Sequence, residues 1–458
     1  MMRTCVYFVI LRFLLASAEC LRVSKDPKMT RCPDHGSTGN PLFLTPYIEA
    51  GRAEEGREAS KVPPLLYDIK SYSGYLTVNK NYQSNMFFWY FPAEKNAESA
   101  PVALWLQGGP GESSIVGLFF ETGPMSIRND STVSSRKYSW TKDIHMIYID
   151  NPVGTGFSFT GNNAGYVTNQ VAVGRDLYSA LIQFYQLFPE LQSHEFFITG
   201  ESYAGKYIPA LAYTIHNNNP TASLKIKLKG MAIGNGVIDP EHMMKYGNYL
   251  VQLGLIDDDG LQQFRRLEAK IVKAIESERY KQATILFGQI FGLFVKEAGN
   301  VNVYNYLLDG NSPTQSNILN KFLCQAHVRK RIHVGGLPFN DGSAVKKYLL
   351  LDETKSVKPW FQTLLEHYRI ILYNGQLDIV AAYPLTVNFI ENLKWSGSSE
   401  YLTAKRKKWF VGSNLAGYSK SVGNFTELLV LNAGHMVPSD QPEGGLDLIR
   451  RLVFNVPF

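Results

Sequence analysis

The fold of this chain is indicated by one hexapeptide, Gly200-Glu201-Ser202-Tyr203-Ala204-Gly205, which stands between a strand-like run and a helix-like run. A reactive serine on such a strand–turn–helix junction needs small neighbours two positions before and after it, because the turn is tight. Gly200 meets this requirement, and Ala204 departs slightly from the usual glycine. A serine that only caps the following helix is the alternative. The flanking strand and helix favour a nucleophilic Ser202 on an α/β sheet.

Apolar strand-like runs alternate with amphipathic helix-like runs on both sides of this turn. Strands are predicted at Val102–Leu106, His145–Ile149, Glu195–Thr199, Leu228–Ile233, Arg369–Tyr373 and Glu427–Leu431. Helices are predicted at 169–187, after Gly200 to about His216, and near 443–454. Strands that alternate with helices pair in parallel and are covered on both faces. The pattern therefore predicts an α/β protein with a mostly parallel central sheet and helices on both faces.

One region breaks this alternation. Residues 239–345 are mainly helical, with predicted helices at Leu261–Glu276 and Tyr280–Glu297, and we interpret them as a helical cap insertion. The apolar run Ile285–Val295 is interpreted as a packed helix face rather than a membrane contact. The insertion divides the core into a first part, 63–238, and a second part, 346–458.

The N-terminus has the layout of a cleavable secretory signal over residues 1–18, with Arg3, an apolar run and the small residues Ala16-Ser17-Ala18. A membrane anchor is less favoured, because about 20 apolar residues are needed to span a bilayer and Arg12 interrupts the run. Residues 19–62 are polar and are interpreted as a leader or a loosely packed N-terminal arm. No later segment is long and apolar enough to span a membrane.

The composition excludes several classes of protein. Of the 458 residues, 45% are hydrophobic and 19% charged, which is typical of a globular chain rather than a disordered one. The 46 Lys and Arg against 40 Asp and Glu give a net charge of +6, too small an excess to indicate nucleic-acid binding. Loss of residues 1–18, which hold two arginines and no acid, leaves +4. The basic run 405–408 is interpreted as a solvated turn.

Four cysteines are too few for a disulfide-built scaffold, and they lack the paired short spacings of a zinc site. No metal and no cofactor are predicted. Cys20 lies at the cleavage zone of the signal, so only Cys32 and Cys324 lie well inside the mature chain. A secreted protein can form disulfides, and Cys32–Cys324 is the pair to test.

A nucleophilic serine needs a base, and the base needs an acid that orients it. In α/β hydrolases the acid and then the histidine follow the serine, each in the loop after a sheet strand. Asp378 and His435 satisfy both the order and the placement. A helix N-cap ahead of Ile379–Phe389 is the other reading of Asp378, compatible with the first, and an ordinary loop histidine is the other reading of His435.

Stabilisation of the oxyanion requires backbone N–H groups beside the reacting carbonyl oxygen. One candidate is the residue after the serine, Tyr203. The other is Gly109, in the glycine-rich loop 107–111 that follows a predicted strand. A phosphate-binding loop is excluded there, because no Gly-Lys-Ser/Thr follows.

Several stretches in their order resemble the serine carboxypeptidases over about residues 65–455: Gln107–Gly111 with Ser113-Ser114, Asn151–Ser158, Gly200–Gly205, Asn374–Asp378 and Gly434–Pro438. Gln107 in place of the commoner asparagine most resembles the vitellogenic-like branch. Glu112 stands where many members have a cysteine, so the disulfide anchored there is absent. The resemblance implies the α/β-hydrolase fold with a cap.

It also implies an exopeptidase that releases one residue from peptides or proteins with a free C-terminus. By the family's motif positions, Gln107, Glu121, Glu201 and the Gly108 N–H would bind the terminal carboxylate. Two close carboxyl groups share protons and one pKa rises, so a protonated glutamate can donate to that carboxylate. We therefore expect an acidic optimum and a lysosomal or extracellular location in the secretory pathway.

Two sequons, at Asn129 and Asn424, are candidate glycosylation sites in a secreted chain. Other functions stay open from the residues alone: another hydrolase or acyltransferase of the same fold, since fold and triad do not set the substrate, or a non-catalytic secreted binding protein. Whether the chain forms a homodimer also stays open. A nucleic acid is not an expected partner, and no membrane span is expected.

Overall fold

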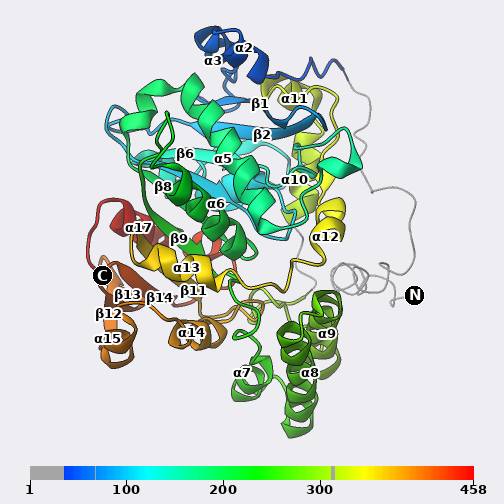
Figure 1. Ribbon diagram of the computed structural model, residues 1–458, viewed down its shortest axis with the longest axis vertical. Helices are drawn as coiled ribbons and strands as arrows, with labels where there is room; N and C mark the ends of the chain where they lie inside the picture. The colour runs from blue at the N-terminus through cyan, green and yellow to red at the C-terminus, as the bar shows by residue number, and fades with distance from the viewer. Residues whose placement is uncertain (1–35, 68, 311–314) are drawn as a thin grey trace.

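The computed structural model describes residues 36–67, 69–310 and 315–458. One ten-stranded sheet, in the order β1-β2-β6-β3-β8-β9-β11-β14-β13-β12, runs through the molecule (Figure 1). Its strands are β1 (Tyr72–Asn79), β2 (Ser84–Phe91), β3 (Val102–Leu106), β6 (His145–Ile149), β8 (Phe196–Glu201), β9 (Leu228–Gly234), β11 (Arg369–Gly375), β12 (Lys407–Val411), β13 (Asn414–Val422) and β14 (Phe425–Val430). Two small sheets pair β4 (Met125–Ile127) with β5 (Val133–Ser135), and β7 (Thr155–Gly156) with β10 (Asn340–Asp341).

The six strands from β6 to β14 in the middle of the sheet are parallel, and an antiparallel pair closes each edge. All residues of β3 and β6 are buried, as expected for parallel strands covered on both faces. The strands predicted at Val102–Leu106 and His145–Ile149 match β3 and β6 residue for residue. The predicted α/β architecture is confirmed.

Helices cover both faces of the sheet and form two separate apolar cores. Val102, Leu104 and Leu106 of β3 face the first core, with α5 (Gln170–Leu187), α6 (Ala204–Asn218), α13 (Lys358–Leu365) and α14 (Tyr383–Glu391). Ala103 and Trp105 face the second core, with α4 (Ser114–Gly117) and α17 (Pro442–Val453). This alternation follows from the two-residue period of a strand. Shorter helical elements are η2 (Leu118–Thr122), α15 (Ser398–Thr403) and α16 (Val437–Asp440).

The region predicted as an insertion lies between β9 and β11. It contains α7 (Tyr246–Gln252), α8 (Asp258–Glu276), α9 (Tyr280–Ala298), α10 (Gln315–Leu323), α11 (Ala326–Arg331) and α12 (Ser343–Leu349). The α8–α9 hairpin projects from the body of the molecule, at the bottom of Figure 1. Its buried side chains, among them Phe264 and Phe294, belong to the first core, whereas those of α10 and α11, among them Phe322 and Val328, join the second core. The region thus packs on both cores, and α12 crosses the predicted boundary at 345.

The apolar run Ile285–Val295 lies in α9, where Ile290, Phe291 and Phe294 are buried. This agrees with the interpretation as a packed helix face. Within the described ranges, none of the helices combines the length and apolar character needed to cross a bilayer.

The N-terminal arm is more tightly packed than its polar composition predicts. The predicted signal, 1–18, and the first part of the arm lie outside the described residues. Beyond them, α2 (Thr45–Glu49) and α3 (Ala53–Ala59) follow a segment that hydrogen-bonds to β1. Leu44 N donates to Tyr75 O at 2.9 Å, and Tyr75 N donates to Leu42 O at 2.9 Å. Leu44 is fully buried, so a few apolar residues within a polar segment are enough to hold it.

The basic run 405–408 is not a turn. Lys407 and Lys408 begin the edge strand β12, with both side chains exposed, and the Arg406 guanidinium lies over the Tyr418 ring. β12 is an edge strand, and exposed lysines on an edge strand oppose pairing with other chains. A charged run is therefore compatible with a strand at this position.

Cys324 is disulfide-bonded. The other cysteines, Cys5, Cys20 and Cys32, lie outside the described residues, so the Cys32–Cys324 pairing stays a prediction.

Candidate active site

Ser202 lies on a sharp turn between β8 and α6, as the sequence pattern predicts. Its φ of 62° places it in the left-handed region, and its N–H donates to Gly234 O at 2.9 Å. A Cβ at Gly200 would come within 2.1 Å of Leu106 O and 3.1 Å of the Ala204 Cβ. The turn therefore needs glycine two residues before the serine, and alanine is tolerated two residues after it.

Asp378 and His435 lie in the loops that follow the neighbouring parallel strands β11 and β14. His435 Nδ1 is 2.9 Å from Asp378 Oδ2, and both residues are buried. A carboxylate accepts hydrogen bonds, so Nδ1 carries the proton and Nε2 is the basic nitrogen. The structure thus pairs the two residues that the sequence selects as base and orienting acid.

Asp378 is not the N-cap of the helix that follows it, so the alternative interpretation of this residue is wrong. The helix α14 begins at Tyr383, not at Ile379. The Asp378 carboxylate instead accepts the N–H groups of Val380 at 2.9 Å and Ala381 at 3.0 Å. These bonds stabilise a non-helical turn ahead of Pro384, because aspartate side chains compete for nearby backbone donors.

The glycine-rich loop after β3 lies directly against the serine turn. A Cβ at Gly108 would come within 2.6 Å of the Ser202 Cβ and 2.5 Å of Tyr203 N. The loop can therefore lie this close to the serine turn only with glycine at position 108. Gly109 has a φ of 112°. Tyr203 is the N-cap of α6, where backbone N–H groups lack a partner within the helix. The structure therefore brings together the backbone of the two candidate oxyanion donors.

Gln107, Glu121 and Glu201 form one buried cluster beside this loop. Gln107 Nε2 donates to Glu201 Oε1 at 2.7 Å and to Glu121 Oε1 at 3.3 Å, and its Oε1 accepts Trp105 Nε1 at 2.8 Å. Glu201 ends β8 and Glu121 lies in η2. Because Gln107 is longer than asparagine, its two amide hydrogens reach both glutamates.

Both glutamates have raised pKa values. Burial raises the pKa of Glu121 to about 7, although hydrogen bonds with Glu201 and Gln107 oppose the rise. Burial, and next the negative charge of Glu121, raise the pKa of Glu201. Glu121 Oε2 and Glu201 Oε2 are buried and make no hydrogen bond within the described part of the chain. A protonated carboxyl there can donate to an anion.

Comparison with known proteins agrees with this geometry. Residues 63–455 match the family described as serine carboxypeptidase. The chain belongs to the serine carboxypeptidase family. It is 48% identical to a venom serine carboxypeptidase of Apis mellifera, over 94% of this chain and 95% of that protein. It is 46% identical to the vitellogenic carboxypeptidase of Aedes aegypti, over 90% of both chains.

It is also 45% identical to the human probable serine carboxypeptidase CPVL, over 92% of this chain and 91% of that protein. Among solved structures it resembles Kex1, a prohormone-processing carboxypeptidase from Saccharomyces cerevisiae, with a TM-score of 0.78 and 25% identity over 87% of this chain and 96% of that one. The α/β-hydrolase fold and serine carboxypeptidase activity follow from these relationships.

Two residues that support the candidate site were not identified from the sequence. Asn235, directly after β9, donates from Nδ2 to Asp378 Oδ2 at 2.8 Å. Asp150 joins the loops after β3 and β6, since it accepts Ser113 Oγ at 2.5 Å and Phe157 N at 2.8 Å. Both follow a predicted strand, which is the available signal, but their partners are distant in sequence.

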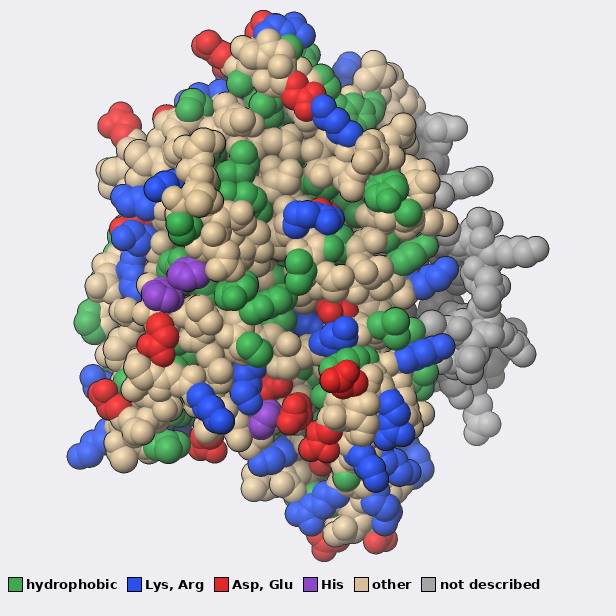
Figure 2. Space-filling model, viewed as in Figure 1, with side chains coloured by type: hydrophobic (Ala, Val, Ile, Leu, Met, Phe, Trp, Pro, Cys, Tyr) green, Lys and Arg blue, Asp and Glu red, His purple; other side chains and the backbone are tan. Residues whose placement is uncertain are grey.

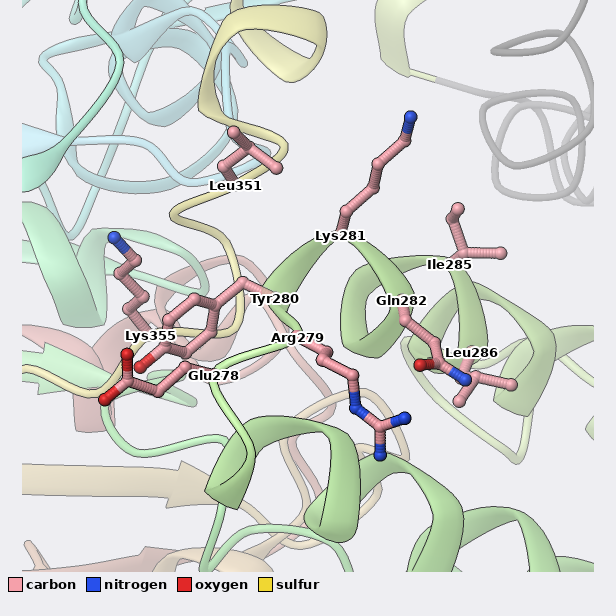
Figure 3. A pocket seen from close by; sticks show the side chains of 9 residues that line it. All are labelled: Glu278, Arg279, Tyr280, Lys281, Gln282, Ile285, Leu286, Leu351 and Lys355. Carbon is pink, nitrogen blue, oxygen red and sulfur yellow. The ribbon is translucent and has the colours of Figure 1, made fainter.

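An open cavity of about 600 Å³ lies away from these residues, at the α8–α9 turn (Figure 3). Arg279, Tyr280, Lys281 and Lys355 are among its lining residues, and none of the predicted site residues is. Lys and Arg side chains gather on the visible side of this hairpin in Figure 2. The candidate active site therefore lies apart from this cavity.

One group in the described ranges has side chains placed as for a metal ion: Asp239, Glu241 and His242. Asp239 Oδ2 already lies 2.6 Å from His242 Nδ1 and 3.6 Å from Lys358 Nζ. The ammonium group would repel a cation, so these residues do not fit a metal site well.

The two sequon asparagines, Asn129 and Asn424, are both exposed, Asn424 at the turn between β13 and β14. A glycan could be attached at either position without displacing core residues.

Proposed function

We propose that Ser202 is the nucleophile of this serine carboxypeptidase, His435 its general base and Asp378 the acid that orients the imidazole. Ser202 Oγ attacks the carbonyl carbon of the last peptide bond, and its proton passes to His435 Nε2. The C–N bond breaks as His435 returns the proton to the leaving amine, and the C-terminal amino acid departs. Water then attacks the acyl-enzyme by the same route, and the shortened peptide is released.

We assign the oxyanion hole to the N–H groups of Gly109 and Tyr203. The support is the close approach of the glycine-rich loop to the serine turn, with Gly108 against Ser202 and Tyr203. Donors held in advance where the negative charge develops stabilise the transition state more than the substrate.

The observation that carries the exopeptidase assignment is the buried glutamate pair, one member of which, Glu201, precedes the nucleophile directly. We assign recognition of the terminal carboxylate to protonated Glu121 and Glu201 and to the Gly108 N–H. Gln107 holds the two glutamates in place, since both its amide hydrogens already have acceptors. Ionised glutamates would repel the substrate, so peptidase activity falls as the pH rises through about 7.

We place the protein in the secretory pathway, in an acidic lysosomal or an extracellular compartment, and propose N-glycans at Asn129 and Asn424. The N-terminal signal pattern and the exposure of both asparagines support this. A relative of 48% identity is a venom protein.

The experiment compares a peptide with a free C-terminus and the same peptide amidated, across pH 4–8. We expect release of the terminal residue from the free acid only, with kcat/KM falling above pH 7, and no release by Ser202→Ala. Full activity of Ser202→Ala would refute the nucleophile. A Glu121→Gln/Glu201→Gln variant keeps donors that do not titrate, so the fall above pH 7 should be weaker.

The peptide assay, together with labelling by a fluorophosphonate, distinguishes the alternative functions. Equal cleavage of the amidated peptide, or an activity confined to esters, would indicate another hydrolase of this fold. Failure of a fluorophosphonate to label the wild type at Ser202 would indicate a non-catalytic binding protein.

A further inference from the structure

The segment Val303–Tyr306, which follows α9 in the insertion, hydrogen-bonds to the chain on both sides of Asp378. Ile379 N donates to Val303 O at 3.0 Å, and Tyr306 N donates to Leu377 O at 3.1 Å. These bonds involve the residues immediately before and after Asp378. The backbone direction at the orienting acid is therefore set partly by the insertion. We call Val303–Tyr306 the brace segment.

The brace segment also binds the histidine loop. His435 N donates to Tyr304 O at 2.7 Å, and the Tyr304 and His435 ring centroids are 5.1 Å apart. A Cβ at Gly434 would lie 2.2 Å from Tyr304 O. Glycine at position 434 thus permits a close contact between the two main chains.

One side-chain contact joins the brace segment to the histidine loop in addition. Asn305 Nδ2 donates to Asp440 Oδ2 at 3.1 Å, and the same oxygen accepts Gly434 N at 2.7 Å. Asn305 Oδ1 accepts Leu307 N at 3.2 Å. Asn305 and Asp440 therefore connect the loop of the insertion to the residue next to His435.

The contact between His435 and Asp378 depends on two loops, each attached to its own strand. Leu377 N donates directly to Ala433 O at 2.8 Å, and the brace segment adds three main-chain bonds that hold both loops. A displacement of about 1 Å in a catalytic group can reduce the rate about a hundredfold. Bonds to the neighbours of Asp378 and to His435 itself oppose such a displacement.

We propose that the brace segment positions the catalytic triad, and that the Asn305–Asp440 hydrogen bond stabilises the brace segment in this place. The insertion thus takes part in triad geometry in addition to covering the core. The proposal rests on the assignment of Ser202, Asp378 and His435 above.

The test uses Asn305→Asp, which removes the donor and sets two carboxylates against each other. Two quantities are measured: the rate of Ser202 labelling by a small fluorophosphonate, and kcat and KM for a peptide. We expect labelling and kcat to fall about tenfold or more, with a smaller change in KM. A role in substrate binding alone would raise KM and leave labelling unchanged, which would overturn the proposal.

Two further variants distinguish a loss of triad positioning from a general loss of stability: a matched control, and a double variant that exchanges the residues at positions 305 and 440. Asn300→Asp makes the same change in the same loop, where Asn300 Nδ2 donates to Asp309 Oδ1 at 3.1 Å, and should leave labelling within about twofold of the wild type. In Asn305→Asp/Asp440→Asn only one carboxylate remains, and the amide at position 440 can donate to it. Because one oxygen of Asp440 accepts both Asn305 Nδ2 and Gly434 N in the wild type, that donation replaces the bond from Gly434 N. This double variant should therefore recover part of the lost rate.

Equal loss in both single variants, or no recovery in the double variant, would overturn the proposal. Melting temperatures decide whether a loss is specific: a fall in labelling that merely follows a fall in melting temperature also contradicts it. Labelling of Ser202→Ala, or none of the wild type, would instead remove the triad assignment and this inference with it.

Discussion

Asn235 and His435 donate to the same oxygen of Asp378, Oδ2, over 2.8 and 2.9 Å. Asn235 is fully buried and also accepts Gly375 N at 3.1 Å through Oδ1. The carboxylate that orients the base is therefore itself oriented from β9, by a residue 143 positions away in the chain. Residues such as Asn235, which orient a catalytic group without taking part in the reaction, help to hold a site in its productive geometry.

Replacement of Asn235 should reduce kcat about tenfold with little change in KM, because the orientation of Asp378 would be lost while substrate contacts stay. Asn235 has a φ of 41°, which glycine adopts without strain. Asn235→Gly therefore removes the hydrogen bonds to Asp378 and from Gly375 N without straining the backbone. Steady-state kinetics on a peptide test this. Asn235→Asp keeps the shape but opposes two carboxyl groups, and it should lose more activity. Wild-type kcat in both variants would contradict the prediction.

Replacement of Gln107 should weaken substrate binding. Gln107→Met keeps the length of the side chain but removes the donors to Glu121 and Glu201. Hydrogen bonds to such groups contribute about 1.5–3 kcal/mol, so KM for a free-acid peptide should rise about tenfold or more. Fluorophosphonate labelling, which needs no terminal carboxylate, should stay near the wild-type rate. An unchanged KM would show that the glutamates need no support from Gln107.

The folded protein should be more stable in mild acid than at neutral pH. Burial raises the pKa of Asp150 and of Glu121 to about 7, and that of Glu201 as well. Each group then binds its proton more tightly in the folded state, so the free energy of unfolding falls as the pH rises from about 4.5 to about 7. His145 acts in the opposite direction, because burial lowers its pKa to about 4.

Burial also raises the pKa of Asp176, Glu268 and Glu353 and lowers that of His216 and His333. The affected carboxyl groups outnumber the imidazoles, so the free energy of unfolding should show a net fall. Chemical denaturation at pH 5 and pH 7 measures it, and Glu121→Gln/Glu201→Gln should reduce the difference. An equal or greater stability at pH 7 in the wild type would contradict the assignment of raised pKa values.

The buried Lys206 should be a strong determinant of stability. Its side chain is fully inaccessible, and Nζ lies 3.4 Å from Asp352 Oδ2 and 3.3 Å from Glu353 O. Asp352→Ala leaves a buried ammonium group without its carboxylate, so the free energy of unfolding should fall by about 3 kcal/mol. The exposed pair Lys61–Glu58 is the control, and Glu58→Ala should change the free energy of unfolding far less, because water screens an exposed pair. Similar effects of the two substitutions, measured in urea, would contradict this.

Local patterns were sufficient to select the residues that we propose as the catalytic triad. Ser202, Asp378 and His435 each follow a strand that can be recognised by its apolar run, and the carboxyl ends of parallel strands meet at one edge of a sheet. Local patterns failed for the arm around Leu44 and for the run 405–408. In both cases a neighbouring strand decides the conformation, and that strand is not adjacent in sequence.

The amino-acid sequence by itself determined the six parallel strands in the middle of the sheet, the serine turn that requires Gly200, and the family. Only the tertiary structure decided that Gln107 donates to both glutamates, that Asn235 orients Asp378, and that the insertion reaches the triad through Tyr304 and Asn305. The physical reason is the range of the interactions. Turn sterics and strand burial act between near neighbours in the chain, whereas these hydrogen bonds form between loops that meet only after the sheet has assembled.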